Sequence, residues 1–215
     1  MCYSKNLSLL SFIFGITASL SLIKFGNERS KNTNTNIVIG YFCMFVSIMQ
    51  FIEYIIWSDI ECVNGYNKFA SIIGPLFNKM QPVIFYLLAY NYIDSNNALP
   101  NNILNIIITL YTSYVIIQFI SYIESGIMCT TINDQGHLDW YWKYDFNYVL
   151  YHLLMLLVCV NYIDNVYIAT AIGLSYLLFV MSIFYFNKNI GEIWCLMITG
   201  IPLVILLIQR IFDND

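Results

Sequence analysis

The sequence predicts an all-α integral membrane protein, built as a bundle of seven transmembrane helices. Hydrophobic residues make up 59% of the 215 and charged residues only 10%, whereas a typical soluble domain carries about a quarter charged residues. A water-exposed surface cannot be covered with so few charges. The apolar residues also gather in stretches of about 20, the length that a helix needs to cross roughly 30 Å of hydrocarbon.

Seven stretches have this length, and polar, turn-forming linkers separate them. The expected spans are 7–25, 37–57, 69–93, 102–124, 145–163, 166–186 and 190–211. Because lipid cannot bond backbone amides, each span is expected to be a helix that satisfies its own backbone. The shortest linkers require the helices that they join to lie antiparallel and side by side. The whole chain, 1–215, is therefore expected to form one membrane domain.

Positive charge in the loops predicts the orientation. The first span follows Lys5 as a secretory signal would, but its apolar run continues to Phe25, which favours a retained helix. Lys24, Arg29 and Lys31 gather around the first loop, whereas acidic residues dilute the basic ones on the opposite side. The N-terminus is therefore expected outside the cell or in a lumen, and the C-terminus in the cytoplasm.

Two loops on the expected outer side carry further predictions. Cys62 in the second loop and Cys129 in the fourth can form a disulfide there, with two free thiols as the alternative. The fourth loop predicts a short hairpin, with strands at 127–132 and 137–142, that is expected to cap the outer face. The chain has no CxxC pair and only two His, which argues against a structural zinc site.

Polar side chains inside the spans are the best pointers to function, because they cost several kcal/mol in a membrane unless they are paired or hydrated. In the second span, Gln50 and Glu53 lie about 10 and 6 Å below the outer end at 1.5 Å per residue. Their spacing of three places them on one face of the helix, and Trp57 extends that face. This face is a candidate ligand-binding or ion-binding surface.

The third span adds Asn78, Lys79 and Gln81, about 14 to 20 Å from its outer end. Pro82 cannot donate to the carbonyl of Asn78, and Pro75 frees a carbonyl in the same way seven residues earlier. A bent helix with free carbonyls suits a cavity filled with water or ligand. The alternative is a sealed network, in which Lys79 and the acidic residue of the second span neutralise each other and hold the helices together.

Three more residues complete the candidate set. Gln118 in the fourth span and His152 in the fifth lie about 10 Å from the outer surface, and Glu192 begins the seventh. Packing is the simpler role for His152, and Glu192 is placed to favour the positive end of its helix dipole. The inner halves of the spans are expected to hold little of comparable polarity.

Two comparisons with known families follow from these residues. Rhodopsins bind retinal through a lysine in the last helix, and 190–211 contains none, which argues against retinal. The segments 49–57, Gln81-Pro82 and 191–195 resemble uncharacterised multi-pass proteins of large DNA viruses and protists. The resemblance implies a viral or protist origin and brings no activity or catalytic residue with it.

The leading functional hypothesis is a small transporter or channel with a polar cavity open to the outer face. Glu53 would bind or relay a small cation or proton, and Lys79 would be its counter-charge. The alternatives are a receptor-like module that binds a small ligand and a structural membrane protein without transport. Missing catalytic motifs argue against an enzyme, and a net charge of −4 argues against nucleic acid. The lipid bilayer is the expected partner, and oligomerisation is left open.

Overall fold

The computed structural model describes residues 4–27, 33–94, 99–126, 128–134, 136–140, 148–164, 169, 172–173 and 190–212, with backbone alone at 27, 148, 190–197 and 212. Within these ranges the long elements are helices. They are α1 (Lys5–Asn27), α2 (Thr33–Ser58), α3 (Tyr66–Tyr92), α4 (Asn101–Glu124), α5 (Tyr148–Tyr162) and α7 (Ile190–Phe212).

Four of these helices, α1 to α4, are long and apolar enough to cross a membrane. The described parts of α5 and α7 contain shorter apolar stretches, Val149–Tyr162 and Ile198–Ile211. Six of the predicted spans thus have a helix within a few residues of their expected bounds, while the predicted span 166–186 lies almost wholly outside the described residues. The protein is an all-α, multi-pass integral membrane protein.

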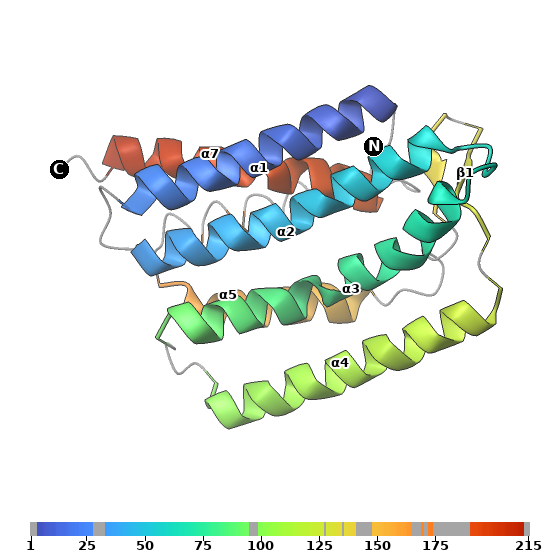
Figure 1. The fold of residues 1–215 in the computed structure, drawn as a ribbon. Coiled ribbons are helices and arrows are strands. Elements are labelled where there is room, and N and C mark those ends of the chain that lie inside the picture. The colour runs from blue at the N-terminus through green and yellow to red at the C-terminus, as the bar shows by residue number, and fades with distance from the viewer. Residues whose placement is uncertain are drawn as a thin grey trace.

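The helices form two layers (Figure 1). α1, α2, α3 and α4 lie side by side in chain order, and α7 and α5 lie behind them. α7 packs against α1 and α2, and α5 packs against α3. α2 is the central element, since it contacts α1, α3 and α7.

Hydroxyl groups inside the spans bond to their own helices. Thr17 donates to the carbonyl of Ile13 at 2.8 Å, and Thr112 donates to the carbonyl of Ile108 at 2.7 Å. Lipid offers these hydroxyls no partner, so a bond to the carbonyl four residues earlier satisfies them locally.

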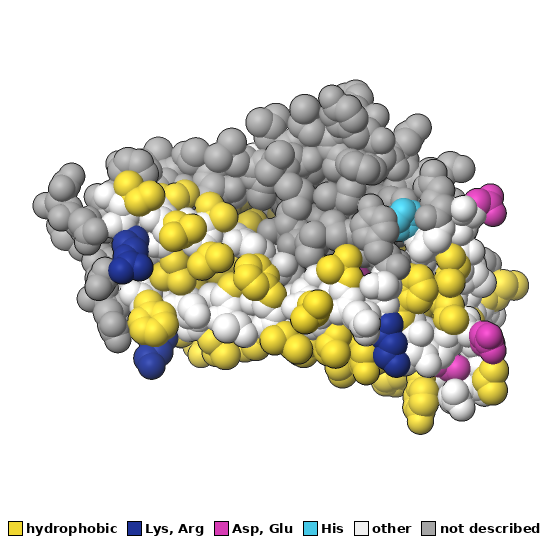
Figure 2. All heavy atoms as spheres, turned by 90° about the horizontal axis from the view of Figure 1, so that it is seen from above, with side chains coloured by type: hydrophobic (Ala, Val, Ile, Leu, Met, Phe, Trp, Pro, Cys, Tyr) yellow, Lys and Arg dark blue, Asp and Glu magenta, His cyan; other side chains and the backbone are white. Residues whose placement is uncertain are grey.

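Large hydrophobic side chains are exposed along the whole length of α4. Its exposed large hydrophobic side chains are Ile103, Ile106, Leu110, Ile116, Ile117, Ile120 and Ile123. Figure 2 shows hydrophobic side chains along another described face, with basic groups towards both ends and acidic groups at one end. Uncharged flanks between charged ends are what a bilayer requires of a spanning helix.

Small residues let α1 approach its neighbours closely. Gly15 faces α2 and α7, and a Cβ there would lie 3.0 Å from the Cβ atoms of Ser47 and Thr199. Gly26 lies against the side chain of Asn36 in the same way. Close backbone approach at small residues is the usual basis of helix packing in membranes, where burial of apolar surface gives no net gain.

The predicted hairpin is present, but its strands are shorter than expected. β1 (Thr131–Ile132) pairs antiparallel with β2 (Leu138–Asp139), so the expected strands 127–132 and 137–142 are too long. Two tertiary contacts end the ladder. Thr130 bonds to side chains of α3, and Trp140 turns into the bundle.

Candidate functional site

The candidate residues of α2 are buried on one face of that helix. Gln50 and Glu53 are each only 2% exposed. The amide nitrogen of Gln50 and the indole nitrogen of Trp57 are both buried, and neither bonds an acceptor within the described part of the chain. A buried donor without a protein acceptor indicates a place for water or a polar ligand. These two donors lie on either side of Glu53 along the helix.

The candidate residues of α3 lie deeper in the bundle. Lys79 is 4% exposed and Gln81 is fully buried, while Asn78 is half-buried. The Gln81 amide accepts a hydrogen bond from the Tyr151 hydroxyl of α5 and donates to Asn78 Oδ1 at 3.3 Å. The structure therefore connects the polar residues of α3 to α5, a link that the sequence did not specify.

Among the described residues, Glu53 and Lys79 are the charged side chains that are buried within an apolar span. The other described charges lie in loops or near helix ends. Both residues have interaction partners. A single charge at the centre of a membrane costs about 2.5–3.5 kcal/mol on insertion scales, so two opposite charges on neighbouring helices are expected to be retained together.

The remaining candidates take separate positions. Gln118 is half-buried and continues the helical stripe of α4 that includes Val115 and Tyr122. His152 is half-buried in α5, with its ring edge-on to Tyr151 at 4.9 Å between centroids. The backbone of Glu192 belongs to α7, and its side chain lies outside the described residues.

Tyrosines of α4 bond the carbonyls near both prolines of α3. Pro75 cannot donate to the carbonyl of Ser71, and the Tyr122 hydroxyl donates to that oxygen at 3.0 Å instead. The Tyr111 hydroxyl donates to the carbonyl of Lys79 at 2.8 Å, one turn before Pro82. The carbonyl freed by Pro75 is thus sealed by a neighbouring helix, which favours the network interpretation at that position.

A buried polar cluster where the hairpin meets α3 was not predicted. The amide of Asn67 donates to the carbonyl of Thr130 at 2.9 Å and accepts from the Thr130 amide at 3.0 Å. The hydroxyls of Ser71 and Thr130 lie 2.7 Å apart. The spacing of four between Asn67 and Ser71 places them on one helix face, but nothing in the sequence indicates that this face meets Thr130.

The disulfide partners lie next to this cluster. The structure joins Cys62 to Cys129, with Cα atoms 6.2 Å apart, within the range of disulfides in proteins. The pairing is the one predicted from the two loops. Cys43 and Cys159 are free thiols in the described spans.

A second buried amide pair lies at the opposite end of the bundle. Asn36 of α2 and Gln209 of α7 exchange two hydrogen bonds, of 3.3 and 2.8 Å, and both are buried. Asn36 lies one residue before the predicted span 37–57, and Gln209 lies close to the end of the predicted span 190–211. The sequence analysis did not name either residue, and their pairing required the packing of α7 on α2.

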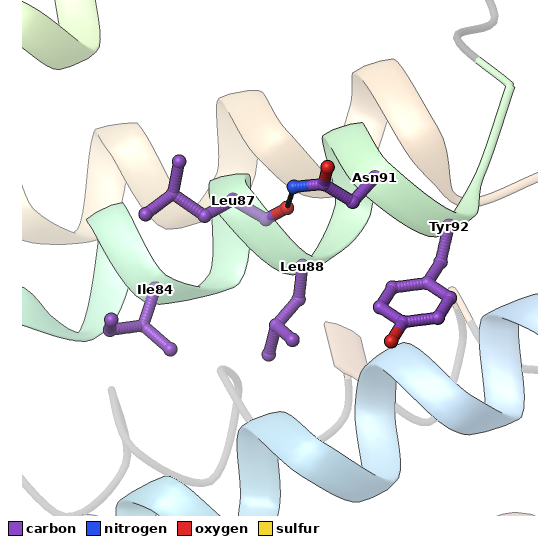
Figure 3. Close-up of a pocket in the computed structure, with 5 residues that line it drawn as sticks. All are labelled: Ile84, Leu87, Leu88, Asn91 and Tyr92. Atoms are coloured by element: carbon purple, nitrogen blue, oxygen red, sulfur yellow. Dashed lines mark hydrogen bonds between the residues drawn. The ribbon is translucent and has the colours of Figure 1, made fainter.

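A separate hollow lies on α3 beyond Lys79, and it is lined mainly by apolar side chains (Figure 3). The lining residues are Ile84, Leu87, Leu88, Asn91 and Tyr92. The Asn91 amide donates to the carbonyl of Leu87 at 2.6 Å, within its own helix. This hollow thus offers less polar chemistry than the face that carries Glu53.

Neither a metal-binding group nor a known relative indicates the function. The described residues contain no group of three or more His, Cys, Asp or Glu that could hold a metal ion. No family model, curated protein or solved structure matches the chain, so the arrangement of its own residues must carry any functional argument.

Proposed function

We propose that this protein is a small membrane transporter or channel in which Glu53 binds or relays a proton or small cation. The proposal rests on the environment of the Gln50 amide nitrogen. It is a buried donor with no acceptor among the described residues, one turn from a buried carboxylate. Water or a polar solute would satisfy it, and a hydrated carboxylate inside a membrane is the usual element of an ion or proton pathway.

Lys79 would act as the counter-charge of Glu53. When Glu53 takes up a proton or cation, the charge balance between α2 and α3 changes, and the packing of the two helices is expected to respond. Gln81 would extend the polar path to α5 through its bond with Tyr151. The proposal thus assigns binding to α2 and charge compensation to α3.

We also propose seven crossings, with the N-terminus outside or lumenal. The exposed Lys24 and Arg210 lie at the end of the bundle opposite the hairpin, in keeping with a cytoplasmic location. A cysteine at the exposed position of Asn34 should then resist an impermeant reagent in intact cells. Rapid labelling of Asn34→Cys, with the hairpin protected, would invert the orientation.

A structural membrane protein is the second candidate. The bonds from Tyr111 and Tyr122 to the backbone of α3, and from Tyr151 to Gln81, are those of a sealed interhelical network. In that case Glu53 and Lys79 would hold helices together without moving a solute.

Reconstituted vesicles separate the two functions. Wild type should carry protons, Na⁺ or K⁺ under an imposed potential, and Glu53→Gln should abolish the flux and destabilise the protein, because it strands a buried cation. The double variant Glu53→Gln, Lys79→Met should recover stability but not flux. Glu61→Gln, which removes an exposed loop carboxylate, is the matched control and should behave as wild type. Absence of any flux from wild type would remove the transport proposal and leave the structural one.

A further inference from the structure

The hairpin is fixed to the bundle at its first end. Cys129 is joined to Cys62, and the adjacent Thr130 is bonded through its backbone and hydroxyl to Asn67 and Ser71 of α3. All of the noncovalent partners are buried. A covalent bond and several buried hydrogen bonds therefore hold the chain at the start of β1.

The second end of the hairpin enters the outer end of the bundle. Leu138 and Trp140 are buried in an apolar cluster that α2, α3 and α4 complete, with Met49, Ile52, Ile56, Ala70 and Tyr122. Gly74 of α3 makes room for the indole, since a Cβ there would lie 2.8 Å from Trp140 Cζ3. The ring thus occupies space that any larger residue at position 74 would take.

This insertion lies against the part of α2 that carries the candidate site. Met49, Ile52 and Ile56 belong to the cluster, and Gln50 and Glu53 are interleaved with them along the same two turns. At 100° per residue, Glu53 points about 40° away from Met49 and about 60° from Ile56. The hairpin therefore packs on α2 at the level of Glu53, and Gln50 lies one turn further in, on the adjoining part of the helix surface.

We propose that the hairpin is a tethered plug, and that withdrawal of Trp140 from Gly74 opens the face of Gln50 and Glu53 to water from the outer side. The anchor at Cys129 and Thr130 would keep the plug attached while Leu138 and Trp140 leave. The inference rests on the proposed function only in that the opening would admit a proton or cation to Glu53. The closure itself depends on packing and can be tested without any flux measurement.

Cysteine accessibility tests the plug directly. Gln50→Cys is introduced into a variant in which Cys2, Cys43, Cys159 and Cys195 are alanine and the Cys62–Cys129 pair is kept. The purified protein is exposed in detergent to a charged, water-soluble methanethiosulfonate reagent. Labelling should be slow. Trp140→Ala should accelerate it at least about tenfold, the factor that corresponds to roughly 1.4 kcal/mol of lost packing.

Two further variants make the test decisive. Gly74→Ala keeps the indole but forces it away from α3, so it should also accelerate labelling, and it serves if Trp140→Ala does not fold. Ile132→Ala changes an exposed residue of the same hairpin and should have no effect. Fast labelling with the plug intact, or unchanged labelling in both folded plug variants, would overturn the proposal. Faster labelling in a protein without flux would keep the plug and remove the transport function.

Discussion

Asn67 shows how one side chain can organise a loop. Its amide group pairs with both the N–H and the C=O of Thr130, as the backbone of a neighbouring strand would. Since the residue is fully buried, both bonds replace water that the backbone of Thr130 would otherwise need. The loop that contains Thr130 is thereby attached to the first turns of α3 rather than to another strand.

Asp59 should make the loop between α2 and α3 sensitive to acid. Its carboxylate accepts the backbone N–H groups of Asn64 and Val63 at 3.0 Å and of Asn67 at 3.2 Å. The bond from Asn64 is the main cause that lowers the pKa of Asp59 below its ordinary value of 3.8. A lowered pKa stabilises the fold above the unfolded value, and this contribution is lost as pH falls through the folded value.

Asp59→Asn should therefore lower the melting temperature at pH 7. The difference from wild type should shrink as the pH is lowered towards 3, because wild type then loses the same charge. Glu61→Asn, in the same loop but exposed, is the control. A difference that stays constant with pH would show that the charge of Asp59 is not what stabilises the loop.

Tyr122 should matter through its hydroxyl alone. Tyr122→Phe leaves the carbonyl of Ser71 without the donor that replaces Pro75, which should cost about 1–3 kcal/mol in unfolding free energy. Pro75→Ala restores a backbone donor, so the same change should cost less in that background. The free energy of unfolding is measured in mild detergent. Tyr114→Phe is the control, because the hydroxyl of Tyr114 bonds none of the described residues. Equal costs in both backgrounds would contradict the role assigned to the hydroxyl.

At the scale of elements, α3 remains one helix from Tyr66 to Tyr92 although it contains two prolines. Its neighbour α4 donates the Tyr111 and Tyr122 hydroxyls to its backbone. A proline in a spanning helix is tolerated where other groups satisfy the freed backbone. The pairing of α3 with α4 is therefore specified by backbone bonds as well as by apolar packing.

The contact of α1 with α2 and α7 should depend on Gly15. In Gly15→Ala the new Cβ meets the Cβ atoms of Ser47 and Thr199 at 3.0 Å. Neither atom can move without its helix, so overpacking should cost about 1–3 kcal/mol. The change is measured as a fall in thermal stability in detergent.

Gly200→Ala is the matched control for that prediction. Gly200 lies in α7, and a Cβ there would have no neighbour within 4 Å. The substitution should be neutral, or stabilising by up to about 1 kcal/mol, because alanine favours helix over glycine. Similar stability changes at positions 15 and 200 would show that α1 is not closely packed.

At the scale of the molecule, polar contacts close both described ends of the bundle. The disulfide and the Asn67–Thr130 bonds hold the hairpin end, and the Asn36–Gln209 pair joins α2 to α7 at the opposite end. Glu53 and Lys79 lie between these two ends.

Cys62 and Cys129 are expected to form a disulfide in protein from an oxidising compartment. Non-reducing peptide mapping by mass spectrometry should recover Cys62 and Cys129 in one cross-linked species. The bond closes a sequence separation of 67 residues, so Cys62→Ser should cost about 2–4 kcal/mol. Recovery of both thiols free, together with an unchanged stability of the serine variant, would remove the bridge.

The fold class and the approximate bounds of six helices could be predicted from hydropathy along the chain. Transfer into lipid depends on the summed hydrophobicity of about 20 consecutive residues, so a local stretch such as Asn101–Glu124 is sufficient to identify a span. The burial of Glu53 and Lys79 followed from the same reasoning, because both lie inside such stretches. The loop positions of Cys62 and Cys129 were also available in the linear chain.

Which polar groups meet could not be predicted in this way, because it depends on how the helices pack. Gln81 bonds Tyr151, and Asn36 bonds Gln209. Thr130, directly before β1, bonds α3 instead of extending the strand. Each of these contacts depends on how a helix is rotated about its axis and which neighbour it packs against. Hydropathy carries no information about either, since lipid-facing and buried apolar faces have similar composition in a membrane, and small residues and hydrogen bonds choose between them.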